Sequence, residues 1–141
     1  MPVMMNEFGS LLYTIPVGFE PISSESLYTF LGAPVSMHTT MTPTVGMYVK
    51  KVGRTTGFTH GRVGAVNVTV EVSYNQGTAT FVNQIYVTGT SFLQAGDSGS
   101  LLVTESGNYP VGLCFAGSDN AAFANPIQPV LQYFGATVIG Y

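Results

Sequence analysis

Alternation between apolar and polar residues is the main pattern along this chain, and it has the two-residue period of half-buried β-strands. The longest run covers residues 62–74, where Val68, Val70 and Val72 alternate with polar residues. The Asn75-Gln76-Gly77 turn leads into a returning run over residues 78–88, as in a β-hairpin. Four shorter runs have strand character, at residues 47–52, 100–104, 111–116 and 121–125. We therefore predict an all-β domain in which six antiparallel strands close a small barrel.

The two ends of the chain break this alternation. Residues 126–135 begin with a proline and end with a glycine, which predicts a short C-terminal helix. Residues 1–44 contain scattered Pro and Gly, with a predicted strand in 11–17, one or two helical turns in 27–31 and an extended connection over 33–43. We divide the chain into an extended N-terminal connector, residues 1–44, and a barrel domain, residues 45–141.

Charged residues make up only 8% of the 141 residues, and the mean hydropathy is +0.31. Typical soluble domains contain about 25% charged residues, so this surface is poorly hydrated for a protein that stands alone. No apolar run approaches the roughly 20 residues that a bilayer helix requires, and we predict no membrane association. We expect other protein chains to cover part of the surface.

The four cations gather in one short stretch, although the formal net charge is −3. They are Lys50, Lys51, Arg54 and Arg62. We interpret them as the solvated face of a hairpin, with an acidic partner surface as the alternative. The acidic balance and the absence of an accompanying stacking aromatic pattern exclude nucleic acid as the expected partner.

Cys114 is the only cysteine, so the chain forms no internal disulfide. The first residues lack the cationic start and continuous apolar core of a secretory signal. We therefore predict no particular localisation from this sequence. No motif calls for a cofactor or a metal ion.

The chemistry of the sequence is concentrated in Gly96-Asp97-Ser98-Gly99-Ser100, directly before the apolar run at residues 101–103. A serine between glycines can attack a carbonyl while the N–H groups of Gly96 and Ser98 stabilise the oxyanion that forms. Gly96 has no side chain to oppose the backbone angles this needs. We expect Asp97 to turn inward and hold the loop through buried hydrogen bonds. The alternative is an ordinary glycine-rich turn that enters a strand.

Two further motifs resemble a known family. The segment from Lys51 to Val63 is similar to the hairpin that opens the second barrel of bacterial trypsin-like serine proteases of the streptogrisin and alpha-lytic type, which read G-R-T-T-G-x-x-x-G-x-V. Residues 110–118 are similar to the strand that lines the substrate cleft in that family. The resemblance covers residues 44–139 and implies the Greek-key second half of a chymotrypsin-like double barrel.

The resemblance also implies an incomplete triad. In that family the general-base histidine and its orienting aspartate belong to a first barrel, and too few residues precede Val45 to build one. His38 and His60 are the only histidines, and the family layout puts both of them away from the serine. We therefore expect the chain to be inactive on its own.

The resemblance assigns substrate-binding positions as well. Phe92 and Leu93 would form an apolar pocket floor, because Phe92 stands six residues before the serine, where enzymes selecting Arg or Lys have an acid. Phe115, Ala116 and Gly117 would form the facing wall, whose backbone pairs with an extended substrate. The substrate residue would then be small or hydrophobic. Alternatively, Phe92 and Phe115 fill this space as part of the core.

Two functions follow from these observations. In the first, the chain is the nucleophile-bearing half of a trypsin-like serine peptidase, and its partner is a chain that supplies the missing barrel. In the second, a protease half-barrel serves as a non-catalytic assembly subunit, such as a capsid-decoration protein on a virus-like particle, and its partners are neighbouring subunits.

Overall fold

The structure of the chain is a computed structural model that describes residues 4–5, 11–13 and 39–138. Two short strands, β1 (Met4–Met5) and β2 (Leu11–Tyr13), pair antiparallel with each other. The helical turns predicted within 27–31 and the connection up to residue 38 lie outside the described residues.

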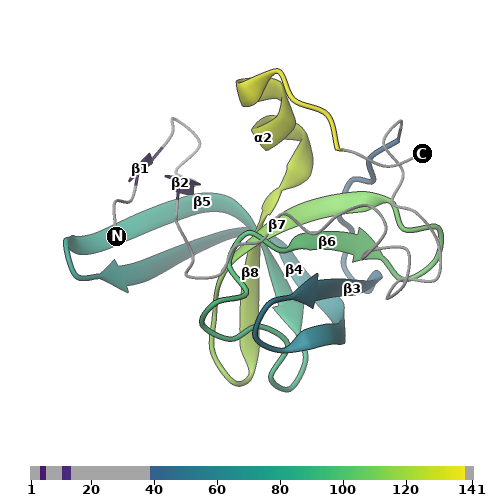
Figure 1. The fold of residues 1–141 in the computed structure, drawn as a ribbon, viewed down its shortest axis with the longest axis horizontal. Helices are drawn as coiled ribbons and strands as arrows, with labels where there is room; N and C mark the ends of the chain where they lie inside the picture. The colour runs from purple at the N-terminus through teal and green to yellow at the C-terminus, as the bar shows by residue number, and fades with distance from the viewer. Residues whose placement is uncertain (1–3, 6–10, 14–38, 139–141) are drawn as a thin grey trace.

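Six antiparallel strands form a closed barrel, as the alternation predicted (Figure 1). The strands are β3 (Tyr48–Gly53), β4 (Gly57–Tyr74), β5 (Gly77–Thr88), β6 (Leu101–Thr104), β7 (Pro110–Gly117) and β8 (Ala121–Pro126). Their order in the sheet is β3-β4-β5-β8-β7-β6, and β6 closes the ring by pairing with β3. The connection from β5 to β6 crosses over the end of the barrel and contains the Gly96–Ser100 motif.

The inward side chains of all six strands meet in one core. Val49, Val63, Ile85, Leu102, Val111 and Ala124 are all buried there, and each comes from a different strand. Burying a side chain such as Val, Leu or Ile contributes about 1.5–3 kcal/mol relative to leaving it exposed. Because every strand contributes, the core fixes the register of the whole barrel.

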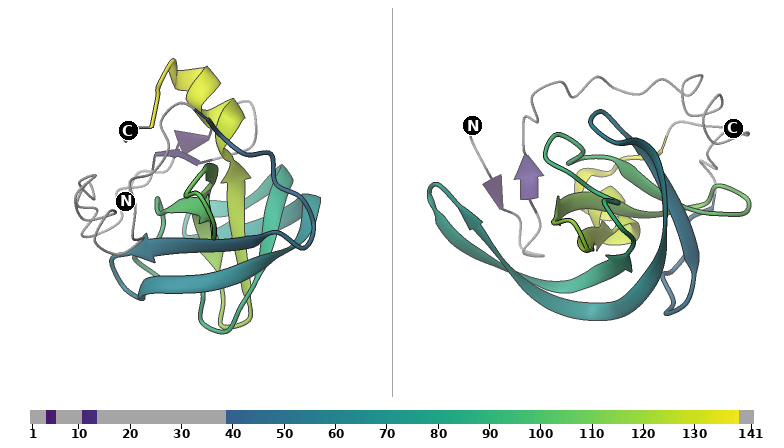
Figure 2. Two further views of the ribbon diagram at one scale, coloured as in Figure 1. Left: turned by 90° about the vertical axis from the view of Figure 1, so that its right-hand side faces the viewer. Right: turned by 90° about the horizontal axis from the view of Figure 1, so that it is seen from below.

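β4 and β5 extend well beyond the barrel. β3 pairs with β4 only over residues 57–62, and β8 pairs with β5 only over residues 85–88. Beyond those pairs the two strands bond to each other alone, out to the Tyr74–Gly77 turn. We call residues 66–84 of this hairpin the arm; it leaves the barrel as a curved ribbon (Figure 2).

The interpretation of the basic stretch as a solvated face is wrong for its two lysines. β3 is a central strand between β4 and β6, and every residue from Val49 to Gly53 is buried. Lys50 and Lys51 are 6% and 0% exposed, whereas Arg54 and Arg62 lie at the surface. An alternating pattern cannot identify a strand whose two faces are both covered.

The predicted C-terminal helix is α2 (Ile127–Phe134). It follows Pro126 and ends at Gly135, whose left-handed φ of 59° lets its N–H bond back to the carbonyl of Gln132. Ile127 anchors the helix to the barrel, while Phe134 in the last turn is exposed.

Candidate active site

Asp97 lies at the centre of the loop between β5 and β6 and is 1% exposed. Its Oδ1 accepts hydrogen bonds from the N–H groups of Thr55 and Thr56, at 2.7 and 3.1 Å. Its Oδ2 accepts from the Thr56 hydroxyl at 2.7 Å and from the N–H of Gln94 at 2.9 Å. The carboxylate thus joins the turn between β3 and β4 to the loop that carries the serine.

Lys51 supplies the counter-charge for this buried anion. Its Nζ lies 3.8 Å from Oδ2 of Asp97, donates to the carbonyl of Gly57 at 3.1 Å and also donates to the Thr56 hydroxyl. Thr56 therefore bonds to both charged groups. The pair satisfies the general requirement that buried charges be matched in sign and hydrogen-bonded.

Burial and hydrogen bonding act on the two pKa values in different ways. Burial opposes ionisation of Asp97, but the donors on Gln94, Thr56 and Thr55 outweigh it and hold the pKa of the carboxyl below its usual value. Burial lowers the pKa of Lys51, and the neighbouring Asp97 offsets part of that shift. Asp97 is therefore an anion at neutral pH.

The half-buried Ser98 is held beside β7. Its hydroxyl donates to the carbonyl of Phe115 at 3.2 Å. On either side of Cys114, the N–H of Gly99 donates to the Cys114 carbonyl at 2.7 Å, and the Cys114 N–H donates to the carbonyl of Ser100 at 2.9 Å. Ser98 therefore stands at the junction between a fixed loop and a core strand.

The backbone N–H groups of Gly96 and Ser98 differ from those of their neighbours in the loop. The N–H groups of Asp97, Gly99 and Ser100 all donate to backbone carbonyls, whereas those of Gly96 and Ser98 have no acceptor among residues 39–138. Gly96 has a φ of 99°, in the region that favours glycine, and an added Cβ would collide with the Thr55 hydroxyl. These two donors are available to an incoming oxygen.

The two histidines do not supply a base in the described part of the chain. Nδ1 of His60 lies 2.8 Å from Oε2 of Glu105, and the ring packs edge-on against Phe58 on the outer face of β4. His38 lies outside the described residues. Within residues 39–138, the Ser98 hydroxyl bonds to a carbonyl and not to an imidazole.

The predicted substrate-binding residues fall into two groups. Phe92, Leu93 and Phe115 are buried, with Phe92 and Leu93 in the main core and Phe115 packed against Phe81 of the arm at 4.6 Å between ring centroids. Ala116 is half-buried and Gly117 is exposed at the end of β7. This burial corresponds to the core-filling alternative for the aromatic residues, and their contact with a substrate stays a prediction.

Sequence reasoning missed the partners of Asp97. Lys51, Thr55, Thr56 and the backbone of Gln94 hold the carboxylate, and three of these four residues belong to the segment that resembles the protease hairpin. A usable signal was present, because a carboxylate expected to be buried needs a cation or several donors nearby. Lys51, Thr55 and Thr56 are among the polar residues of that hairpin.

Two further findings concern the described residues alone. Residues 39–138 and the two short strands contain no group of His, Cys, Asp or Glu side chains placed to hold a metal ion. In the same part of the chain, no helix has the length and apolar character needed to cross a membrane.

The family comparison and the curated relatives agree with the resemblance. The family model described as Nal1 C-terminal domain matches residues 32–125. Streptogrisin-A of Streptomyces griseus is 29% identical over 139 residues, which cover 95% of this chain and 43% of that protein. Glutamyl endopeptidase 2 of the same organism is 32% identical over 139 residues, which cover 94% of this chain and 67% of that protein.

The solved structures give the same fold. Chymotrypsin of Cellulomonas bogoriensis superimposes with a TM-score of 0.62 and 30% identity, over 78% of this chain and 58% of that one. The homologues and the structural neighbours are thus bacterial serine proteases of the chymotrypsin fold, and the chain spans less than half the length of streptogrisin-A. The expectation of a trypsin-like second barrel is confirmed.

Proposed function

Because this chain belongs to the Nal1 C-terminal domain family and has the fold of the bacterial chymotrypsin-like serine proteases, we propose that it is the nucleophile-bearing half of a serine peptidase. Ser98 is the nucleophile, and the N–H groups of Gly96 and Ser98 form the oxyanion hole. Asp97 is a positioning residue that holds the loop.

The proposed chemistry is acyl transfer. A general base takes the proton of the Ser98 hydroxyl while Oγ attacks the substrate carbonyl, and the carbonyl oxygen becomes an oxyanion between the two N–H groups. Collapse of this intermediate breaks the C–N bond, and the released amine receives the proton from the base. Ser98 keeps the acyl group as an ester, which water then hydrolyses by the same steps. The free donors on Gly96 and Ser98 support this role, because each oxyanion donor is worth about 10²–10³ in turnover.

The base comes from outside residues 39–138. Within them, the Ser98 hydroxyl donates to Phe115 and the ring of His60 pairs with Glu105. We assign the base to a histidine on a partner barrel, which would replace Phe115 as acceptor of the Ser98 proton. Loss of the base lowers turnover by a factor on the order of 10⁶, so the chain alone is nearly inert.

The hydrogen-bonded cage around Asp97 is the observation that carries the proposal. A glycine-rich turn that only entered a strand would not need a buried carboxylate with four donors and a lysine. Such a carboxylate costs desolvation energy, and here its contacts set the backbone of the residues on either side of it. Those two residues, Gly96 and Ser98, carry the N–H groups that have no acceptor among residues 39–138.

A thiol in place of the hydroxyl tests the oxyanion hole without a base, because cysteine is nucleophilic without full activation. In the full 141-residue chain, Ser98→Cys should be acylated by p-nitrophenyl acetate at least about tenfold faster than Ser91→Cys. Ser91 is exposed on the same connection, and burial of Cys114 raises its pKa to about 12, so the native thiol does not compete. Equal rates for the two variants would refute the nucleophile and oxyanion assignment.

The requirement for a partner is tested separately with the unmodified chain and a fluorophosphonate probe. We expect no adduct on Ser98 by intact mass, with Ser98→Ala as the matched blank. An adduct on Ser98 but not on the blank would show that the base lies within this chain. If neither thiol nor hydroxyl reacts, the non-catalytic assembly role becomes the better description.

A further inference from the structure

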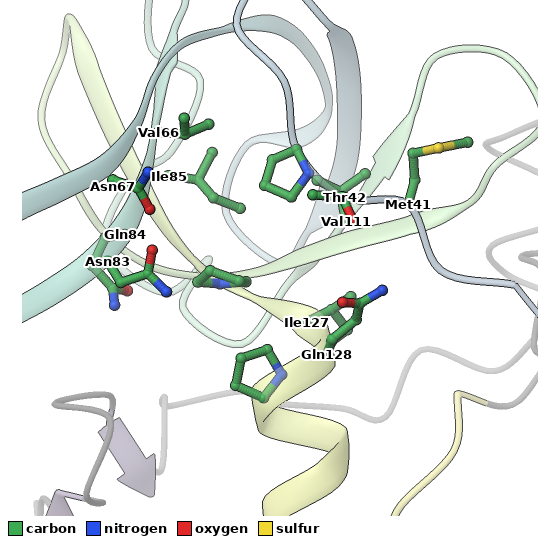
Figure 3. Close-up of a pocket in the computed structure, with 13 residues that line it drawn as sticks. Met41, Thr42, Val66, Asn67, Asn83, Gln84, Ile85, Val111, Ile127 and Gln128 are labelled. Atoms are coloured by element: carbon green, nitrogen blue, oxygen red, sulfur yellow. The ribbon is translucent and has the colours of Figure 1, made fainter.

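A pocket lies on the side of the barrel, between the base of the arm, the segment Met41–Pro43 and the first turn of α2 (Figure 3). Its cavity volume is about 270 Å³. None of the residues from Phe92 to Ser100 lines it, and its β7 contribution is Val111 rather than Phe115. The pocket is therefore separate from the candidate active site.

The lining that residues 39–138 give this pocket is uncharged. Val66, Ile85, Val111 and Ile127 form apolar walls together with three prolines, and among residues 39–138 no Asp, Glu, Lys, Arg or His contributes to the lining. A charged ligand group would lose its hydration there without gaining a counter-charge. The pocket thus favours a neutral ligand with an apolar body.

The amide groups of Asn67, Asn83 and Gln84 gather on one side of the pocket (Figure 3). Gln84 is already engaged, since its Nε2 donates to the carbonyl of Val82 at 2.6 Å and its Oε1 accepts from Asn125 at 2.5 Å. The side chains of Asn67 and Asn83 are exposed and have no hydrogen bond to residues 39–138. Two neutral groups, each with a donor and an acceptor, are therefore open to a ligand.

Paired β-bulges put these two asparagines at the pocket. Val66 and Asn67 together oppose Ile85, and Val82 and Asn83 together oppose Thr69, so each strand has one extra residue at this place, in addition to a separate register shift in β4 between Val63 and Ala65. Asn67 and Asn83 both have left-handed backbones, with φ of 55° and 59°. Bulges bend a ribbon and redirect side chains, and this pair turns one amide from each strand toward the base of the arm.

We propose that this pocket is a second peptide-binding site, which takes one large apolar residue of an uncharged peptide segment. The apolar walls receive the side chain. The amides of Asn67 and Asn83 bond to the peptide N–H and C=O groups that flank it. A cavity of 150 Å³ suffices for benzene, so the larger volume here accommodates an aliphatic or aromatic side chain with its backbone.

The test uses the full 141-residue chain labelled with ¹⁵N and titrated with N-acetyl-L-leucinamide. A ligand of this size binds with a dissociation constant in the millimolar range. We expect chemical-shift changes at the amides of Val66, Asn67, Asn83 and Val111, and binding at least about fivefold weaker for the carboxylate N-acetyl-L-leucine. No shift at these amides up to the solubility of the probe would overturn the proposal.

Variants test the contributions of the two amides and of the cavity to binding separately. Asn67→Gly and Asn83→Gly keep the positive φ while removing the amide, and each should weaken binding by about twofold to tenfold. Ser91→Gly is the matched control, because Ser91 also has a left-handed φ of 50° and is exposed but does not line the pocket.

Thr42→Trp blocks the cavity from an exposed position in its lining and should abolish the shifts. Unchanged affinity in both glycine variants would refute the hydrogen-bonding role, and unchanged affinity in Thr42→Trp would refute the site. Both readouts are binding measurements, so they stand whether or not Ser98 proves to be a nucleophile.

Discussion

A carboxylate with 1% of its surface exposed has lost nearly all of its hydration, and at Asp97 four hydrogen bonds and Lys51 replace it. Net stability from such a pair is small, because the attraction mainly offsets desolvation. Its value lies in geometry. The same contacts also join the loop that contains Gly96 and Ser98 to the turn between β3 and β4.

Asp97→Asn should destabilise the chain by about 3–5 kcal/mol, since it leaves Lys51 charged and buried without a counter-ion. The double variant Lys51→Met/Asp97→Asn should recover part of that loss, because it removes the orphaned charge. Urea unfolding at neutral pH measures both. A double variant less stable than Asp97→Asn alone would contradict the assignment of Lys51 as the counter-charge.

The lowered pKa of Asp97 predicts loss of stability in acid. The ordinary pKa is about 3.9, and the folded value lies below it, so the unfolded chain binds the proton first. The contribution of this carboxylate is complete well above pH 4 and is lost as the pH falls through the folded pKa. Unfolding free energies between pH 7 and 3 should decline less steeply in Asp97→Asn; parallel curves would contradict this source of acid sensitivity.

Gly53 is a second requirement of the same site. A Cβ on this residue would collide with Oδ1 of Asp97 and lie 2.9 Å from the Ser100 hydroxyl. Gly53→Ala should cost about 1–3 kcal/mol, as other changes that overpack a core do. Gly57→Ala is a useful comparison because nothing lies near its added Cβ, although its φ of 64° carries backbone strain alone. Equal losses would mean that space around Asp97 is not the constraint.

At single residues, the sequence predicted the inward direction of Asp97 but not its partners. A carboxylate beside an oxyanion hole would oppose the developing charge, so an inward direction follows from electrostatics alone. Lys51 is buried because its amine lies among Thr56, Gly57 and Asp97, which come from the start of β4 and from the β5–β6 loop. That information is in the topology and not in the alternation of residues 47–52.

Within the barrel sheet, the arm is the part with the least support. Its strands pair only with each other beyond the barrel, and a two-stranded ribbon is marginally stable without a covered face. Phe81, buried against Phe115, is its attachment to the wall beside Ser98.

Amide hydrogen exchange should be fast in the arm and slow in the barrel, with the change occurring near Phe81. Amides of residues 70–80 are expected to exchange at least about 100-fold faster than those of Leu102 and Val111, because the arm can open without disrupting the barrel. Phe81→Ala should accelerate exchange in the arm further, whereas Val82→Ala, at an exposed position of the same strand, should not. Uniform protection across arm and barrel would contradict an independently opening element.

The limits of the barrel strands were largely predictable except at the start of β4, which begins at Gly57 and not at residue 62, and the bulges were not predictable. Regular valines at 68, 70 and 72 indicate one continuous strand, which β4 is. The register of β4 against β5 shifts between Val63 and Ala65 and again between Ala65 and Val68. A bulge is fixed by the register of two strands, so neither strand alone specifies it.

For the whole molecule, the low charge and the exposed apolar residues both describe a surface that is poorly hydrated. Val45, Tyr48, Val82 and Phe134 are all more than half exposed. Scattered apolar residues are common on surfaces, but with 8% charged residues the remaining surface does little to hydrate them. The proposed peptidase half would use part of this surface to bind the barrel that supplies the base.

Exposed residues reserved for a partner should contribute little to the stability of this chain. Val82→Thr/Phe134→Ser is expected to change the unfolding free energy by less than about 1 kcal/mol, near the sum of two ordinary surface substitutions. Thermal and urea unfolding of the full chain give the comparison, with Val111→Thr as a buried control. A loss as large as that of the control would place Val82 and Phe134 in the chain's own core.

The backbone of Cys114 holds the serine loop to β7 at both Gly99 and Ser100, and its side chain is sealed in the core. A maleimide reagent can reach this sulfur only when β7 separates from its neighbours. The rate at which a maleimide dye modifies Cys114 in the native chain would therefore report how often the hydrogen bonds between β7 and the serine loop open.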